Sequence, residues 1–322
     1  MKKKKSNKII FFLLSIFLST ALYPTQSHAD EANDVSDFKI LQHNVFFLPK
    51  QISWWKPNTR AKLISESEFI KGQDAIIFNE LFDNKSSEIL MDSLKDDYEY
   101  QTSVLGRSKN GWDQTLGSYS NFVPEDGGVA ILSKWPIEEK VQYVYKEACG
   151  ADYYSNKGFV YTKINKKGEN IHIIGTHMQA TQESGCKNGE PAKVRNAQFN
   201  EMRKFIEEKD IPKSETIIIG GDMNVMKSDT EEYQSMLDIL NVGDPTYTGH
   251  TGTWDPETNA IAGYSYPDYA SQHLDYIFIE KDHAQFGDWV NEALNIKSPK
   301  WTAITNEYDE YSDHYPVRAY IK

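Results

Sequence analysis

Short apolar runs recur along the chain and determine its predicted architecture. Most contain β-branched residues, are bounded by Gly, Asp or Asn, and are too short to be free-standing helices, so they predict β-strands. The expected strands cover residues 38–47, 75–78, 129–132, 159–164, 171–175, 217–219, 274–279 and 317–321. Lys166-Lys167-Gly168 predicts a hairpin turn between two of these strands, 159–164 and 171–175.

Helical periodicity appears between some of the expected strands. Phe199, Met202, Phe205 and Ile206 fall on one face of a segment from about 192 to 208. Less regular patterns predict helices over 60–71, 86–94 and 230–240. Hairpins mixed with strand–helix units indicate an α/β fold, a layered α/β sandwich in which sheets pack together beneath outer helices. A simple doubly wound sheet would require a more regular alternation of strands and helices.

The first 29 residues have the pattern of a secretory signal peptide. Lys2 to Lys5 and Lys8 form a basic region, residues 9–18 are apolar, and Ser27-His28-Ala29 offers small residues to a signal peptidase. We expect cleavage after Ala29, a secreted, extracellular protein, and a single domain over residues 30–322. The alternative is an uncleaved anchor, for which the apolar run is short.

The charge of the chain restricts its partners. Cleavage removes five lysines and no carboxylate, which leaves 30 basic and 47 acidic residues and a net charge of −17. A polyanionic nucleic acid is repelled by such a field on average, so we expect no nucleic-acid partner. The chain is expected to be a monomer.

Cys149 and Cys186 are the two cysteines of the sequence. Two cysteines in an exported chain usually pair, so a disulfide bond is predicted. A metal-binding pair is disfavoured because no third and fourth ligand lies at a suitable spacing.

Titratable and metal-ligand side chains lie next to the apolar strands, one strand after another. They stand in six short stretches: His43-Asn44, Asn79-Glu80, Thr176-His177, Asp222-Met223-Asn224, His273-Leu274-Asp275 and Ser312-Asp313-His314. Any one stretch can be a turn, a cap or a structural hydrogen bond. Six of them in one chain favour a shared site.

The residue types of these stretches suit hydrolysis of a phosphate ester. Mg²⁺ takes oxygen ligands and keeps waters, so a carboxylate and an amide such as Glu80 and Asn44 suffice to bind it. A neutral histidine can take a proton from the attacking water, and a carboxylate fixes its tautomer. His314 with Asp275 is the candidate pair.

Four motifs resemble, in order and spacing, the exonuclease–endonuclease–phosphatase superfamily: Asn79-Glu80, Gly220-Gly221-Asp222-Met223-Asn224, Leu274-Asp275-Tyr276 and Ser312-Asp313-His314. The resemblance implies a deoxyribonuclease-like fold, with two packed mixed β-sheets flanked by helices. Further stretches resemble the bacterial secreted neutral sphingomyelinases of the sphingomyelinase C or β-haemolysin type. They are residues 43–45, 78–84, 105–108, 125–130, 156–161, 175–177, 254–256 and 273–278.

The resemblance implies a role for each candidate residue. Glu80 is the expected metal ligand, with Asn44 beside it and Asp313 close to the metal. The expected catalytic residues are His314 as general base, Asp275 behind it, His177 at the phosphate, and Asp222 and Asn224 for positioning the phosphate and the water. Mg²⁺ is the expected cofactor, with Co²⁺ or Mn²⁺ as substitutes. The cysteine pair also falls where that family has its disulfide.

Two further expectations concern a membrane surface. Asn84, Glu125 and Asp126 match a second, edge metal site associated with membrane binding, although the residues alone suggest a turn into a strand. The family has an aromatic-rich hairpin before its final Ser-Asp-His, whereas residues 297–310 here carry few aromatics and three carboxylates. Membrane contact is expected from Trp301 and Ile304, with Trp54 and Trp55 as a second contact; the alternative is that the tryptophans simply pack.

The expected function is Mg²⁺-dependent hydrolysis of sphingomyelin to ceramide and phosphocholine at a sphingomyelin-containing membrane, as a haemolysin or virulence factor. A secreted endonuclease of the same fold is one alternative, and the acidic net charge argues against it. Export argues against a phosphoinositide phosphatase. A non-catalytic host-binding toxin is a third alternative, but every proposed catalytic position holds a competent residue.

Overall fold

A computed structural model describes residues 37–49, 53–181, 184–303 and 305–322. All of them belong to one compact unit, Asn33–Lys322. The expected signal peptide, residues 1–29, lies outside the described residues. None of the helices in the described ranges has both the length and the apolar character needed to cross a membrane.

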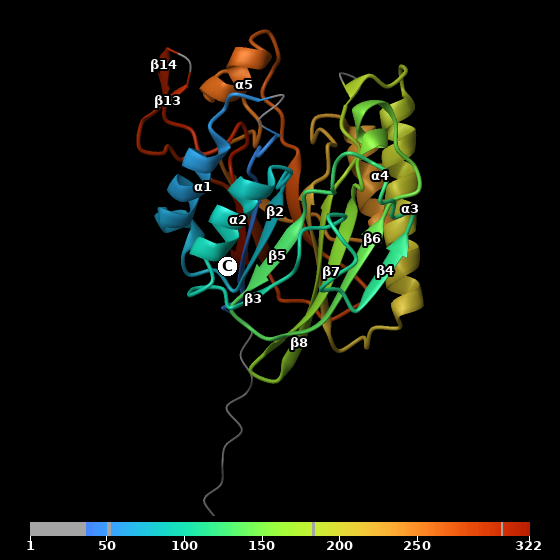
Figure 1. The fold of residues 1–322 in the computed structure, drawn as a ribbon. Helices are drawn as coiled ribbons and strands as arrows, with labels where there is room; N and C mark the ends of the chain where they lie inside the picture. Colours follow the sequence, from blue (N-terminus) through green and yellow to red (C-terminus); the bar gives the residue numbers. More distant parts are fainter. Residues whose placement is uncertain (1–36, 50–52, 182–183, 304) are drawn as a thin grey trace, which may run out of the picture. The chain divides into compact units, whose positions relative to one another are not determined.

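Two mixed β-sheets form the centre of the fold (Figure 1), which confirms the expected sandwich of packed mixed sheets. The first sheet has the order β10-β12-β15-β1-β2-β5-β3, and its strands are β1 (Lys39–Asn44), β2 (Ala75–Asn79), β3 (Tyr100–Gln101), β5 (Ala130–Ser133), β10 (Thr246–Gly249), β12 (Trp289–Ala293) and β15 (Val317–Ile321). The second has the order β11-β9-β8-β7-β6-β4, and its strands are β4 (Gln114–Gly117), β6 (Ile137–Val144), β7 (Gly158–Lys166), β8 (Glu169–His177), β9 (Thr216–Asp222) and β11 (Asp275–Ile279). A small separate hairpin joins β13 (Trp301–Ala303) and β14 (Asn306–Tyr308).

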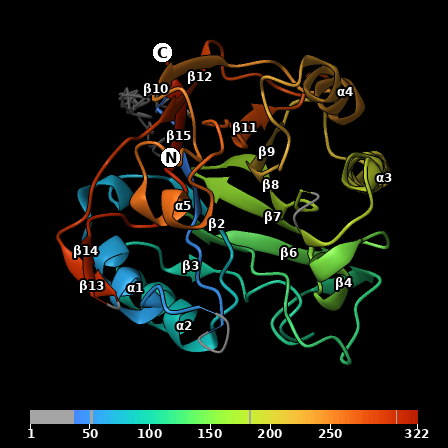
Figure 2. The ribbon, with the colours of Figure 1, turned by 90° about the horizontal axis from the view of Figure 1, so that it is seen from above.

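Helices lie on the outer faces of both sheets (Figures 1 and 2). The first sheet is flanked by α1 (Pro57–Glu66) and α2 (Asn84–Ser93), and the second by α3 (Glu190–Lys209) and α4 (Thr230–Leu240). The short helix α5 (Ala260–Ser265) lies at the same end of the sheets as the β13–β14 hairpin. The described residues also contain two 3₁₀ turns, η1 (Glu68–Ile70) and η2 (Gly150–Tyr154).

The core consists of three apolar layers, because the central strands of both sheets are buried on both faces. Ile40, Ile77, Ile131, Val160 and Ile218 are among the residues that pack between the sheets. Their neighbours along the strands point outward, toward α1 and α2 on one side and toward α3 and α4 on the other. This double burial explains why these strands are continuous apolar runs in the sequence.

Parallel pairing brings the polar strand ends to one edge. β1 and β2 run parallel with Asn44 opposite Asn79, and β8 and β9 run parallel with His177 opposite Asp222. β11 pairs antiparallel with β9 and starts there, with Asp275 opposite Asp222. The carboxyl ends of parallel strands share an edge, so these residues gather at one end of the sandwich.

Two glycines let the sheets approach closely just below that edge. A Cβ atom on either Gly175 or Gly220 would come within 2.9 Å of the side chain of Ile77 on the facing sheet. Contacts under 3.0 Å force a shift of one side, so a larger residue at either position would push the sheets apart.

Two predicted elements end earlier in the structure than in the sequence pattern. The first strand stops at Asn44 rather than at residue 47, and Phe46 has a left-handed backbone with φ 53°. The helix predicted over 60–71 spans Pro57–Glu66, because the Ser67 hydroxyl and N–H both donate to the carbonyl of Ile64 and end it.

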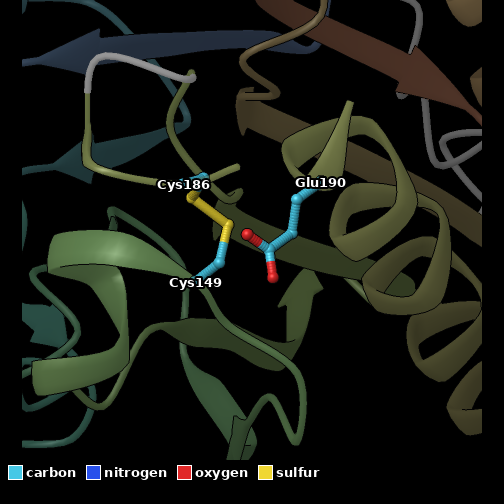
Figure 3. A group of neighbouring side chains, drawn as sticks. All are labelled: Cys149, Cys186 and Glu190. Atoms are coloured by element: carbon cyan, nitrogen blue, oxygen red, sulfur yellow. A yellow bond between two sulfur atoms is a disulfide. The ribbon is translucent and has the colours of Figure 1, made fainter. Parts of the chain in front are cut away.

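A disulfide bond joins Cys149 and Cys186 (Figure 3), with S–S 2.01 Å, across 37 residues of sequence. It connects the residue before η2 to the segment that precedes α3. Glu190 lies beside it, but both sulfurs are oxidised, so this group offers no thiolate to a metal.

Removing the disulfide should destabilise the protein without changing the fold. The double variant Cys149→Ser/Cys186→Ser is expected to lose roughly 4 kcal/mol of unfolding free energy, because the unfolded chain regains the entropy of the closed loop. Urea denaturation measures this loss. The wild type under reducing conditions is the control and should match the variant; a loss below about 1 kcal/mol would contradict the prediction.

Candidate active site

Five of the predicted residues meet at the polar edge of the sandwich. The Asn44 amide donates to Glu80 Oε1 at 2.9 Å and to Asp222 Oδ2 at 3.0 Å. His177 Nε2 lies 3.7 Å from Asp222 Oδ2 and 3.9 Å from Glu80 Oε1. His314 Nε2 lies 3.8 Å from the same Asp222 oxygen. Side chains from β1, β8, β9 and the segments after β2 and before β15 therefore form one cluster.

The backbone is locally strained at two of the predicted site residues. Glu80 and Asn224 have left-handed conformations, with φ 60° and 52°. Such conformations cost a non-glycine residue on the order of 1 kcal/mol and concentrate at functional sites. Backbone hydrogen bonds to adjacent segments hold Glu80 in place. Its carbonyl accepts from Phe47 N at 3.0 Å, and the N–H of the next residue, Leu81, donates to Gly128 O at 2.9 Å.

A buried amide network supports the cluster from within the sheets. Gln42 Nε2 donates to Asn79 Oδ1 and to Asp275 Oδ1, both at 2.8 Å. The Asn79 side chain also accepts from the backbone N–H of Asp222 at 3.0 Å and donates to Thr176 O at 2.9 Å. Gln42 was missed in the sequence, where its signal is a polar residue at an inward position of an apolar strand.

His314 and Asp275 form the predicted pair, with 2.8 Å between His314 Nδ1 and Asp275 Oδ2. Burial by itself would lower the pKa of His314, but Asp275 and Asp313 raise it well above its usual range. Burial would raise the pKa of Asp275, and the neighbouring His314 outweighs this and lowers it. The two groups therefore stabilise each other in their charged forms.

The positive charge near the carboxylates of the cluster is too small to offset the effect of burial on their pKa values. Burial, aided by Asp313, raises the pKa of Glu80 to about 7, and burial, aided by Asp275, raises the pKa of Asp222 to about 6. Burial also raises the pKa of Asp313. Glu80 has an amide, Asn44, rather than a cation as its hydrogen-bond donor. Oxygen ligands of this kind, held close together at raised pKa values, fit a divalent cation such as Mg²⁺.

Lys157 is a buried cation of the site that sequence reasoning did not single out. Its Nζ lies 2.9 Å from Asp152 Oδ2 and 3.3 Å from His177 Nε2. Burial, with Lys157 and His314 as further causes, lowers the pKa of His177 well below its usual range, so His177 is neutral. Asp152 belongs to η2, directly after the disulfide residue Cys149.

Arg60 lies entirely buried behind the site. Its guanidinium donates to four backbone carbonyls: Trp55 O at 2.8 Å, Val45 O at 2.6 Å, Phe46 O at 2.5 Å and Tyr311 O at 3.0 Å. Burial lowers the pKa of Arg60 to about 10, opposed by Asp313 and Glu80, so it remains charged at neutral pH. One cation thus ties together three segments that border the site.

A cavity of about 630 Å³ opens onto the cluster. It is lined by polar residues of the site, including Glu80, Asn224, Asp313 and His314. Aromatic side chains line the rest of its wall, including Trp54, Trp254, Tyr266 and Tyr269. The cavity is therefore polar where the predicted chemistry lies and aromatic beside it.

The three residues predicted for an edge metal site line a second cavity of about 490 Å³. Asn84 is the first residue of α2. Glu125 and Asp126 are adjacent in sequence and line the same cavity. Asp126 already has partners, since Arg107 Nε donates to it at 2.8 Å and Gly128 N at 2.9 Å. A cation at this site would have to share Asp126 with Arg107.

The expected membrane residues are placed differently from one another. Trp301 is 6 % exposed, packs against Tyr308 and donates its indole N–H to Glu310 O, so it does not lie on the surface as a membrane contact would. Ile304 lies outside the described residues. Trp55 is buried, whereas Trp54 is 48 % exposed.

Comparisons with known proteins agree with this geometry. The sequence profile of the Endonuclease/Exonuclease/phosphatase family matches residues 41–314. The chain is 48 % identical to a phospholipase C of Staphylococcus aureus over the full length of both proteins. It is 50 % identical to a sphingomyelinase C of Bacillus cereus, over 91 % of each.

A solved structure is also similar, that of a Staphylococcus aureus beta toxin mutant with bound magnesium ions. It is 50 % identical, with a TM-score of 0.87, over 89 % of this chain and all of that one. The profile match and these relatives show that the chain belongs to the endonuclease/exonuclease/phosphatase family.

Proposed function

We propose that this protein is a secreted sphingomyelin phosphodiesterase that releases phosphocholine and ceramide, with Mg²⁺ as its cofactor. The observation that carries the proposal is the cluster at the sheet edge, where the paired His314 lines one cavity with carboxylates and the neutral His177 lies next to Glu80. Relatives named sphingomyelinase C, about half identical over nearly the whole chain, support this substrate. Action on host membranes as a haemolysin is part of the same proposal.

Glu80, with Asn44 and Asp313, would hold the metal, because these oxygen-bearing side chains have raised pKa values or an amide dipole in the cluster. When bound, Mg²⁺ neutralises a phosphate oxygen and stabilises the departing oxygen. The substitutes would be Co²⁺ or Mn²⁺, which accept similar ligands.

His314 is the proposed general base. Asp275 fixes its Nδ1, so Nε2 is left to take a proton from the attacking water. The carboxylates Asp275 and Asp313 raise the pKa of His314 and so favour its protonated form. A cation held beside Asp313 would oppose the charge that raises the pKa of His314 and would favour the neutral imidazole that accepts a proton.

The remaining residues would position the phosphate. His177, neutral and beside Lys157, and Asn224 would contact it, while Asp222 orients Asn44 and faces both histidines. These groups hold the reacting atoms in line rather than exchanging protons.

The membrane role is proposed for the cavity rim and the edge cavity. Trp54, half exposed at the mouth of the active cavity, would insert at the lipid interface, where indole rings are well accommodated. Asn84, Glu125 and Asp126 would hold a second cation. The protein would act outside the cell as a monomer.

Loss of the His314–Asp275 pair should abolish turnover. His314→Ala is expected to lower kcat on sphingomyelin liposomes by about 10³-fold or more, and Asp275→Asn by about 10²- to 10⁴-fold, because the base loses its function or its tautomer. Phosphocholine release in Mg²⁺ measures both.

The control is His250→Ala, which removes a second His–Asp pair at 2.7 Å, with Asp255, outside the residues that line the active cavity. It should retain activity. Plasmid nicking that depends on His314, together with no phosphocholine release, would identify an endonuclease instead.

Mg²⁺ affinity should fall as the pH drops below about 7, by about tenfold per pH unit, because Glu80 must lose a proton to bind the metal. Glu80→Gln should weaken binding by at least about 10-fold and remove most of this pH dependence. Isothermal titration calorimetry at pH 6, 7 and 8 tests both. Glu201→Gln, another carboxyl whose pKa is raised by burial, is the matched control outside the site.

The stability of the metal-free protein follows from the same shift. The pKa of Glu80 is higher in the folded than in the unfolded state, so between pH 4.5 and 7 the folded state binds more protons. This group's contribution to stability is therefore present at low pH and lost as the pH rises through 7.

In the calorimetry experiment, an Mg²⁺ affinity that does not change with pH would contradict Glu80 as the metal ligand.

Trp54→Ala should weaken binding to sphingomyelin-containing vesicles by about tenfold, because an exposed indole at the interface is removed. Vesicle co-sedimentation measures it. Trp301→Phe is the comparison, since a buried tryptophan should affect folding stability and not vesicle affinity. The opposite result would place the contact at Trp301.

A further inference from the structure

Three aromatic side chains form one wall of the active cavity, and their rings stand at steep angles to one another. The ring centroids of Trp254 and Tyr266 are 5.4 Å apart at 64°. Trp254 and Tyr269 are 6.2 Å apart at 88°, and Tyr266 and Tyr269 are 5.3 Å apart at 67°. We call these three residues the aromatic corner. All three line the cavity that also contains His314.

The backbone fixes this corner beside the proposed base. Trp254 forms isolated β-bridges with His314 on one side and with Gln272 on the other. Tyr315 N donates to Thr253 O at 2.7 Å and tightens the same pairing. A ligand whose phosphate lies at His314 therefore has the corner as its neighbour.

The two tyrosines are accessible from the cavity. Tyr266 is 38 % and Tyr269 is 42 % exposed, while Trp254 is 8 % exposed. Tyr264, in the same segment, packs on Trp54 and Trp55 instead and does not line the cavity. Simple burial of apolar surface therefore does not account for Tyr266 and Tyr269.

Ring faces carry partial negative charge, so several faces meeting at large angles attract a cation. A quaternary ammonium has no N–H to donate, and a wall of aromatic faces is its usual protein partner. A primary ammonium holds its water more strongly and needs hydrogen-bond acceptors. The aromatic corner is thus suited to bind a methylated cation. Its β-bridge to His314 places it next to the expected phosphate position.

We infer that the aromatic corner, Trp254, Tyr266 and Tyr269, binds the trimethylammonium group of the phosphocholine head and makes the enzyme specific for choline esters. The inference rests on the proposed function and adds the residues that select the head group. A corner that only packs would not distinguish a charged head group from a neutral one of the same shape.

The test compares two water-soluble esters with full-length enzyme in Mg²⁺. One is 4-nitrophenyl phosphocholine, and the other is its neutral carbon isostere, 4-nitrophenyl 3,3-dimethylbutyl phosphate. Wild-type enzyme should prefer the choline ester by about tenfold or more in kcat/KM, because only that ester carries the cation.

Tyr269→Leu and Tyr266→Leu should each lower kcat/KM for the choline ester by about tenfold and leave the isostere within about twofold. Tyr269→Phe keeps the ring face and should retain the preference. Tyr264→Leu is the control from the same segment and should change neither ester. Because the readout is a ratio between two substrates, partial misfolding lowers both rates and does not move it.

A binding arm separates this inference from the proposed function. Calorimetry with phosphocholine and with 3,3-dimethylbutyl phosphate should show tighter binding of phosphocholine, lost in Tyr269→Leu, even if sphingomyelin is not hydrolysed. Absence of hydrolysis with this binding preference intact would overturn the function alone. Equal binding of both ligands by the wild type, or equal losses on both esters in the variants, would overturn the aromatic corner.

Discussion

The two sheets are joined at their catalytic end by amide side chains, and the site depends on this junction. Below it, Ile77 packs directly against Gly175 and Gly220, so the interface is apolar and tight. At its end Gln42 and Asn79 replace the apolar contacts with hydrogen bonds to both sheets. A buried amide left unsatisfied costs about 1–3 kcal/mol, so these bonds fix the sheets relative to each other within hydrogen-bond tolerance.

The same junction concentrates charge. Asp275 accepts a hydrogen bond from Gln42, Asp222 donates its backbone N–H to Asn79, and both carboxylates lie next to His314. Amides stabilise the position of a carboxylate but supply no net positive charge, so burial drives the pKa of Asp222 upward. A rigid, electron-rich set of oxygens at the sheet edge is the result, and it provides the electrostatic basis for cation binding.

Much of this arrangement was readable from the sequence, because it follows from strand pattern and strand direction. All eight predicted strands exist, and the residues beside them meet where parallel pairing places them. The unpredicted strands β6 and β12 contain charged residues at partly exposed positions, which interrupts the apolar signal. Arg60 was missed because its partner Tyr311 comes from a distant segment, and Lys157 because its contact with His177 forms only when β7 pairs with β8.

The aromatic residues show where sequence reasoning ends. The sequence alone does not tell whether a tryptophan faces lipid or packs in the interior. Trp301 was expected to face lipid, and in the structure it packs against Tyr308. Likewise, residues 254, 266 and 269 form a corner only because the β-bridges of Trp254 return the chain to His314. Side-chain environment here is a property of the tertiary contacts.

The buried Arg60 affects which positions near the site can vary in sequence during evolution. Its guanidinium binds main-chain carbonyls, which every amino acid supplies, and not the side chains of the segments that it holds. A substitution at the partly exposed Phe46 or Tyr311 therefore removes no acceptor from Arg60, whereas Val45 and Trp55 are buried and are held by core packing as well. The side chains at positions 46 and 311 can thus vary while Arg60 holds the backbone of the segments that border the site.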